Sequence, residues 1–131
     1  MTTRRASCSC GGLSVTTTSE PVRISICHCT DCQRRTGSVF GVQARFQASS
    51  VSIDGPSARW TRTADSGNTI DFYFCPVCGS TVFYRPSAEP ELIAVAVGAF
   101  ADASFPAPGV SVYEARRHPW VEVPDGVEHF D

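Results

Sequence analysis

The seven cysteines constrain this chain most, because their spacings match those of metal ligands. They fall into three groups, Cys8-x-Cys10, Cys27-x-Cys29-x-x-Cys32 and Cys75-x-x-Cys78. An odd number of clustered cysteines fits a disulfide framework poorly, whereas short Cys-x-Cys and Cys-x-x-Cys spacings are typical of zinc sites. We therefore expect most of these thiols to bind metal.

The first and last groups each supply half of a tetrahedral site. Residues i and i+2 of a strand face the same side, so Cys8 and Cys10 can bind one ion together. The segment "FCPVCGS" is typical of zinc knuckles and ribbons, with Pro76 restricting φ and Gly79 able to adopt a positive φ. Together the two pairs predict a closed structural zinc site on Cys8, Cys10, Cys75 and Cys78.

The middle group then forms a second site with an open coordination position, which is the mark of a catalytic or ligand-binding zinc. Its ligands are Cys27, Cys29 and Cys32, which gives two zinc ions per chain. Two other interpretations stay open at this point. Cys75 and Cys78 can instead join the 27–32 cluster, and a single cysteine can simply be a small buried apolar residue.

Short alternating segments separated by Gly and Pro turns predict an all-β fold. We expect a small, zinc-containing, β-sandwich-like domain of packed antiparallel sheets that spans residues 1–131 as one domain. A single helical turn is predicted near 30–36, with Thr30 or Asp31 capping its start and Gly37 its end. The tail "HPWVEVPDGVEHFD" is predicted as extended coil, anchored by Trp120 and by Val121 or Val123. The predicted strands cover residues 13–18, 22–27, 38–46, 50–53, 58–63, 68–74, 80–85, 91–98 and 110–115.

Composition excludes some classes of partner. The formal net charge is -2, which gives no electrostatic attraction to nucleic acid or to anionic lipid. The chain contains no apolar run of membrane-spanning length and no apolar segment typical of a signal peptide. We therefore expect a cytoplasmic protein with reduced thiols, no nucleic-acid partner and no membrane partner.

Four segments resemble the glutathione-dependent formaldehyde-activating enzyme family, which includes centromere protein V. They are "CSCGGLSV", "CHCTDCQRRTGSVF", "FCPVCGSTVFY" and "HPWVEVPDGVEHF", in the family's order. The resemblance implies a fold of packed β-sheets shared with methionine sulfoxide reductase B. It also implies a structural zinc on the four outer cysteines and a catalytic zinc on the middle three.

The family's founding activity is carbon–sulfur lyase chemistry, the condensation of formaldehyde with glutathione to S-(hydroxymethyl)glutathione and its reverse. The resemblance therefore implies a small thiol such as glutathione, or its aldehyde adduct, as substrate. A zinc ion held by three thiolates is suited to bind a further thiol, so we expect water at the fourth position at rest and a substrate thiol during turnover.

Residues around the middle group are the candidates for substrate binding. Gln33, Arg34 and Arg35 follow the last ligand, and an arginine there can hold a substrate carboxylate. His28 lies between two ligands and is predicted to point away from their face. Asp31 either caps the helical turn or orients a ligand. His118 and His129 are expected to bind no metal.

Three other functions are alternatives to the carbon–sulfur lyase. A nucleobase deaminase needs a glutamate beside its ligands, which this chain lacks. A methionine sulfoxide reductase-like redox enzyme needs a free cysteine outside the zinc site, and Cys32 is the candidate for it. A non-catalytic zinc-binding module that binds a protein partner needs a fourth protein ligand for the middle group. The number of bound zinc ions separates these, since one favours the reductase and two favour the lyase.

Overall fold

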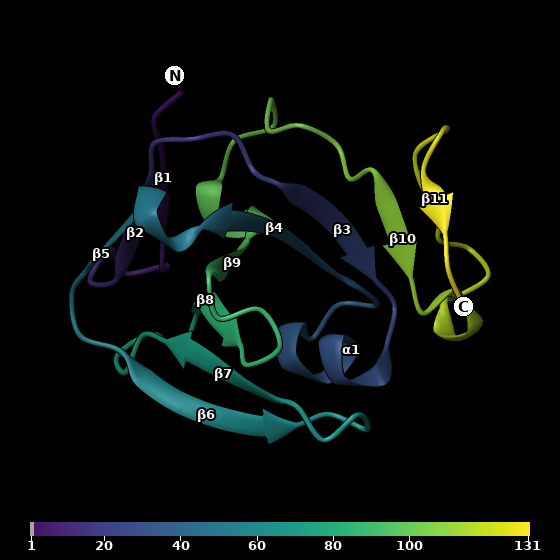
Figure 1. Ribbon diagram of the computed structural model, residues 1–131, viewed down its shortest axis with the longest axis horizontal. Coiled ribbons are helices and arrows are strands. Elements are labelled where there is room, and N and C mark those ends of the chain that lie inside the picture. The colour runs from purple at the N-terminus through teal and green to yellow at the C-terminus, as the bar shows by residue number, and fades with distance from the viewer. Residues whose placement is uncertain (1) are drawn as a thin grey trace.

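In the computed structural model, which describes residues 2–131, most of the ordered structure is β-strand, in two sheets (Figure 1). The smaller sheet has the order β1 (Arg4–Ser7), β2 (Ser14–Thr17), β5 (Val51–Asp54). The larger sheet has the order β11 (Glu128–His129), β10 (Val110–Val112), β3 (Arg23–Cys27), β4 (Gly41–Gln47), β9 (Leu92–Ala96), β8 (Thr81–Pro86), β7 (Thr69–Phe74), β6 (Ala58–Thr63). The helical elements are α1 (Thr30–Thr36) and three short 3₁₀ helices, at Ala48–Ser50, Val97–Phe100 and Glu114–Arg116. The predicted all-β class is confirmed.

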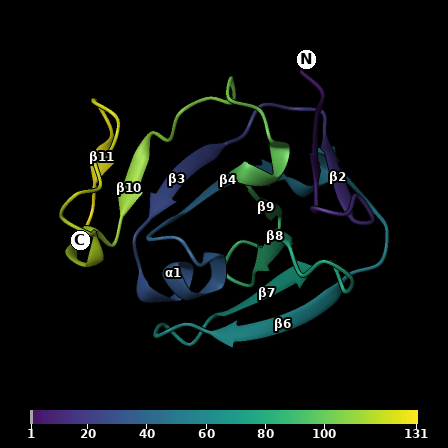
Figure 2. The same ribbon diagram turned by 180° about the vertical axis from the view of Figure 1, so that it is seen from behind.

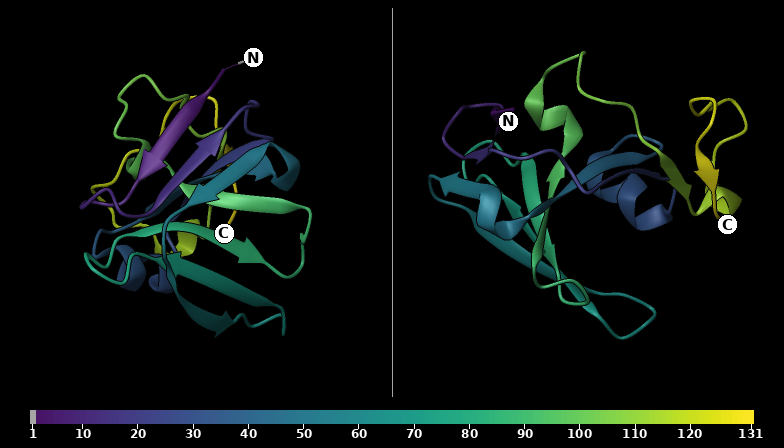
Figure 3. Two further views of the ribbon diagram at one scale, coloured as in Figure 1. Left: turned by 90° about the vertical axis from the view of Figure 1, so that its left-hand side faces the viewer. Right: turned by 45° about the horizontal axis from the view of Figure 1, so that its top comes forward.

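All strand pairs are antiparallel except two at one edge of the larger sheet, as far as residues 2–131 show. Strand β10 pairs in parallel with both β3 and β11. Each predicted strand range overlaps an observed strand, and three observed strands (β4, β5 and β8) end one residue beyond the predicted range, whereas β1 and β11 were not predicted. The views from behind and from the top place β11 and the smaller sheet at opposite ends of the molecule (Figures 2 and 3).

The tail differs from its prediction in two ways. Glu128–His129 forms β11 rather than coil. Trp120 is 70% exposed and anchors nothing, whereas Val121 is buried as predicted. Residues that join a sheet edge by backbone hydrogen bonds need no apolar alternation, so the sequence pattern gave no sign of this strand.

The main core lies between the two sheets. Ala6 of β1 and Val15 of β2 pack with Ala44 and Phe46 of β4 in one fully buried cluster. Because successive strand residues point to opposite faces, the intervening Gln43 and Arg45 of β4 project from the other face of the larger sheet.

That other face carries α1, which lies in the concave side of the larger sheet between β3–β4 and β6–β7 (Figure 1). The helix is capped by Cys29, whose Sγ accepts a hydrogen bond from the backbone N–H of Cys32, so the predicted caps Thr30 and Asp31 are wrong. Gly37 ends the helix with a φ of 72°, as predicted. Gly41 allows the close approach of α1 to β4, since a Cβ there would lie 3.0 Å from Nη2 of Arg35.

None of the helices within residues 2–131 has the length and apolar character needed to cross a membrane.

Candidate functional site

Four cysteines from two distant turns come together at the edge of the main core. The Sγ atoms of Cys8, Cys10, Cys75 and Cys78 all lie within 4.8 Å of one another. Cys10 Sγ is 3.6 Å from Cys8 Sγ and 3.6 Å from Cys75 Sγ. Zinc–sulfur bonds of about 2.3 Å place tetrahedral sulfurs about 3.8 Å apart, so this donor set fits zinc.

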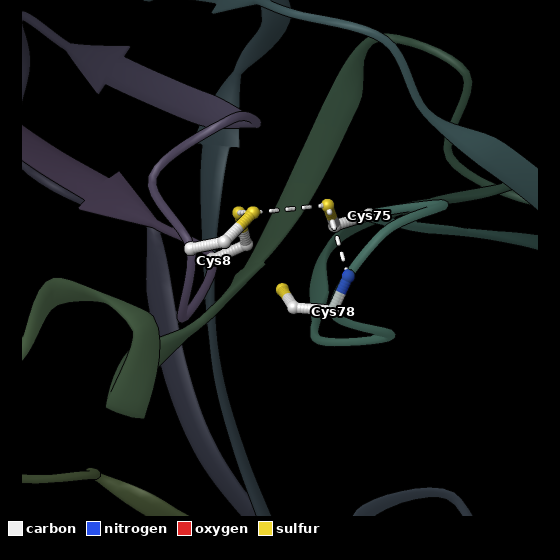
Figure 4. Close-up of side chains that lie close together, drawn as sticks. Cys8, Cys75 and Cys78 are labelled. Atoms are coloured by element: carbon white, nitrogen blue, oxygen red, sulfur yellow. Dashed lines mark hydrogen bonds between the residues drawn. The ribbon is translucent and has the colours of Figure 1, made fainter.

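The surrounding backbone and hydroxyl groups are arranged to stabilise thiolates. Figure 4 shows the sulfur of Cys8 facing those of Cys75 and Cys78, which lie on the turn between β7 and β8. The Leu13 N–H donates to Cys8 Sγ over 3.2 Å and lowers the pKa of Cys8. Hydrogen bonding from Ser80 lowers the pKa of Cys78 to about 5. Gly79 has a φ of 79° beside this turn, as predicted.

The other three cysteines form a second cluster on one continuous segment. Cys27 ends β3, Cys29 caps α1 and Cys32 lies in its first turn, and their Sγ atoms lie within 4.8 Å of one another. The division of seven thiols into four and three is therefore confirmed. The interpretation in which Cys75 and Cys78 join the 27–32 cluster is wrong, because they lie with Cys8 and Cys10 instead.

The three close thiols cannot all ionise without a counter-charge. Hydrogen bonds from Cys27 and Cys32 lower the pKa of Cys29 to about 2, while hydrogen bonding to Cys29 and burial raise the pKa of Cys27. One thiolate is thus stabilised by two thiols that keep their protons. A divalent cation can replace those protons, which makes this cluster a good metal ligand set as well.

The three-thiol cluster forms one wall of a cavity of about 490 Å³, which is within the range of small-molecule sites. Its floor is the concave face of the larger sheet. In register across the strands lie Arg23, Arg45, Ala94, Tyr84 and Phe72, from β3, β4, β9, β8 and β7 in turn. We call this space the thiol cavity.

Arginines dominate the charge of the thiol cavity. Five line it, together with two aspartates, Asp31 and Asp65; the arginines are Arg23, Arg35, Arg45, Arg62 and Arg116. Arg62 is paired with Asp31 at 2.9 Å and Arg45 with Glu89 at 3.4 Å. Within residues 2–131, the other three arginines form no ion pair. The cavity therefore suits an anionic ligand.

Of the three residues expected to bind substrate, only Arg35 lines the thiol cavity. Its guanidinium lies over the rings of Phe72 and Tyr84 and has Nη2 3.8 Å from Cys32 Sγ. Arg34 is exposed and does not line the cavity. Gln33 Nε2 donates to the His28 carbonyl over 2.9 Å, and its Oε1 is 3.0 Å from His118 Nε2, so Gln33 links α1 to the tail.

The other polar residues near the ligands have structural partners. His28 is fully buried, with Nε2 3.0 Å from Ser111 Oγ on β10, and burial lowers its pKa. Asp31 pairs with Arg62 of β6 instead of capping the helix. These contacts attach the segment that carries Cys27, Cys29 and Cys32 to β10 and β6.

Most residues that line the thiol cavity were not predicted from the sequence. Arg23 and Ser25 share the strand face of Cys27 by simple alternation, so this part of the lining was accessible from the sequence. Tyr84, Phe72 and Arg62 come from strands paired on the far side of the sheet, and no local pattern places them beside α1.

Comparison with known proteins agrees with this geometry. The family model described as "Glutathione-dependent formaldehyde-activating enzyme" matches residues 3–116. The chain belongs to this family. Among curated proteins, none matches the sequence significantly. A crystal structure of a Rhodobacter sphaeroides protein, a structural genomics target, aligns with a TM-score of 0.58 and 17% identity over 97% of this chain and 99% of that one. At this identity the likeness establishes the fold alone.

Proposed function

We propose that this protein is a zinc-dependent carbon–sulfur lyase that forms or cleaves a thiol adduct of an aldehyde, with S-(hydroxymethyl)glutathione as the model substrate. The observation that carries the proposal is the three-thiol cluster in the wall of the thiol cavity. The family's named member is a formaldehyde-activating enzyme that depends on glutathione, which supports the choice of thiol and aldehyde.

The two clusters suit different roles for zinc. Cys8, Cys10, Cys75 and Cys78 supply a complete tetrahedral set, as structural sites do. Cys27, Cys29 and Cys32 supply three donors and leave one position toward the cavity. A zinc ion held by these three thiolates would bind a further thiol and lower its pKa, so that the substrate sulfur is available as a thiolate.

The chain's own residues supply binding and orientation. Arg23, Arg35 and Arg116 are available for the carboxylates of a peptide thiol, since they have no ion-pair partner among the described residues. Phe72 and Tyr84 form an apolar wall next to the cysteines, which excludes water from one side of the reacting carbon.

The reaction needs no oxidant or reductant. The substrate sulfur bonds to the aldehyde carbon, the carbonyl electron pair moves to oxygen, and the proton lost by the thiol is balanced by one taken up at that oxygen. Cleavage is the reverse. A methionine sulfoxide reductase-like reaction would instead require one thiol of the cluster to stay free of metal, so the metal count separates the two.

Metal analysis with a thiol challenge tests the proposal. We expect two zinc ions per chain, one of which is lost on dialysis against excess glutathione. We expect that Cys29→Ser already lacks this second ion. In the cobalt-substituted protein, glutathione should change the visible spectrum, whereas S-methylglutathione, which has the same charges and no thiol, should not.

The alternatives predict other results. Two ions that no thiol displaces or perturbs would indicate two closed sites and a protein-binding module. One ion throughout would favour a redox enzyme.

A further inference from the structure

Tyr84 is a buried polar residue of the thiol cavity that the proposed chemistry has so far used only as a wall. It lies in β8, is 5% exposed and lines the cavity with Cys27 and Cys32. Within residues 2–131, its hydroxyl makes no hydrogen bond, and the hydroxyl oxygen is not one of the fully buried polar atoms without a partner, so it is open to the cavity that Tyr84 lines. A hydroxyl in a cavity wall with no protein partner is free to hydrogen-bond a ligand atom there.

The neighbours of Tyr84 hold its ring firmly. The ring packs against Phe72 at a centroid distance of 5.0 Å, and the Arg35 guanidinium lies 5.4 Å from its centroid on another side. Its cross-strand partner on β9 is Ala94, which in turn lies opposite Arg45 of β4. These contacts hold the ring of Tyr84 in place in the wall of the thiol cavity.

The environment also keeps the hydroxyl protonated. Burial raises the pKa of Tyr84 well above its usual range, although the positive charges of Arg35 and Arg45 act in the opposite direction. A tyrosine in this state donates a hydrogen bond at any working pH. Arg35 places Tyr84 near the three-thiol cluster, because its guanidinium lies 5.4 Å from the Tyr84 ring centroid and its Nη2 lies 3.8 Å from Cys32 Sγ. A substrate sulfur held at the cluster would bring the adjacent carbon and its oxygen into this part of the cavity.

We propose that the hydroxyl of Tyr84 binds the oxygen of the aldehyde-derived carbon, as a hydrogen-bond donor to the carbonyl of the aldehyde and to the hydroxyl of the thiol adduct. This inference rests on the proposed function. As the carbon–sulfur bond forms, the carbonyl electron pair moves to the oxygen, and Tyr84 stabilises the growing negative charge until the oxygen takes up a proton. The ligand class is thus an aldehyde adduct with oxygen on the carbon bonded to sulfur, rather than a simple thiol.

The test compares Tyr84→Phe with Tyr73→Phe. Both substitutions remove only a hydroxyl, but Tyr73 stacks on Phe83 against the main core and lies outside the cavity lining. In the cobalt-substituted protein, the spectral change on adding glutathione measures thiol binding. Subsequent addition of formaldehyde measures adduct formation on the protein. Exchange between free ¹³C-formaldehyde and the adduct, followed by NMR, measures turnover.

We expect Tyr84→Phe to bind glutathione like the wild type, to need at least about tenfold more formaldehyde for the second spectral change, and to exchange at least about tenfold more slowly. Tyr73→Phe should match the wild type in all three. If Tyr84→Phe needs no more formaldehyde than the wild type, the role of Tyr84 is wrong and the proposed function stands. If the wild-type spectrum responds to neither glutathione nor formaldehyde, the proposed function is wrong and the role of Tyr84 falls with it.

Discussion

The two cysteine clusters use the same ligand atoms in different structural settings. The four-thiol cluster joins a turn near the N-terminus to the β7–β8 turn, more than sixty residues away in sequence. The three-thiol cluster lies within six residues of one segment, so it closes no long loop. A link between distant segments stabilises the fold, whereas a local cluster beside a cavity holds the chain together little and is free to serve chemistry.

Their surroundings differ in the same way. The four-thiol cluster adjoins the apolar core, with Cys8 and Cys75 among its buried residues. The three-thiol cluster shares the thiol cavity with five arginines and with Tyr84. Each difference can be tested by a matched pair of substitutions.

Loss of one thiol from each cluster should give the largest contrast. We expect Cys75→Ser to lower the free energy of unfolding by about 3 kcal/mol or more, because the link between the sheets is lost with its metal. Cys29→Ser should lower it by no more than about 1 kcal/mol, since serine can also cap α1. Chemical denaturation together with zinc analysis measures both effects. Equal losses of stability in the two variants would contradict the division into structural and reactive clusters.

The backbone around the four-thiol cluster should be less tolerant of change than that near the tail. Gly55 has a φ of 99°, and a Cβ there would lie 1.8 Å from the Gly12 carbonyl oxygen, beside the turn that carries Cys10. Gly55→Ala should therefore cost about 2 to 4 kcal/mol and weaken zinc retention at the four-thiol cluster.

Gly126→Ala is its control, because Gly126 has a φ of 82° with no atom within 4 Å of the added Cβ. We expect it to cost about 1 kcal/mol, from backbone strain alone. Thermal denaturation of the two variants in excess zinc measures the difference, and similar midpoints would show that the Gly55 contact can relax.

Replacing each of the two neighbouring arginines of α1 should weaken glutathione binding at the three-thiol cluster to a different extent. Arg35 lines the thiol cavity, whereas Arg34 is exposed outside it. We expect Arg35→Met to weaken glutathione binding to the cobalt protein about five- to tenfold at low salt, and less at high salt. Arg34→Met should change it by less than about twofold. A larger effect at Arg34 would mean that the substrate lies over the outer side of the helix.

The two cysteine clusters were predictable because each pair of neighbouring thiols is marked by a short spacing in the sequence. Cys-x-x-Cys in a turn brings two sulfurs to one side, as predicted. Cys8 and Cys10 also lie together, but in the turn after β1 and not on an extended strand, so the strand geometry expected for them is wrong.

The helical turn at 30–36 was predicted from Thr30 or Asp31 as its start and Gly37 as its end, although its N-cap proved to be Cys29. Strand β11 was missed because parallel edge pairing leaves no alternating pattern.

The cavity residues were not predictable in the same way. Arg34 and Arg35 were both predicted to bind substrate because they follow Cys32 in the sequence. Arg35 lines the thiol cavity, whereas Arg34 is exposed to solvent. Arg45 and Tyr84 are brought together through β9, and Arg62 reaches α1 because the β6–β7 hairpin extends the same sheet.

The sequence by itself determined the all-β class, the seven metal-type thiols and the family, since strand alternation and ligand spacing act over a few residues. Only the tertiary structure decided which cysteines lie together. It also decided which arginines line the thiol cavity beside Cys27, Cys29 and Cys32, and that Tyr84 lines the same cavity. The physical reason is that the lining comes from six strands, α1 and a 3₁₀ helix, and the order of these strands in the sheet differs from their order in the chain.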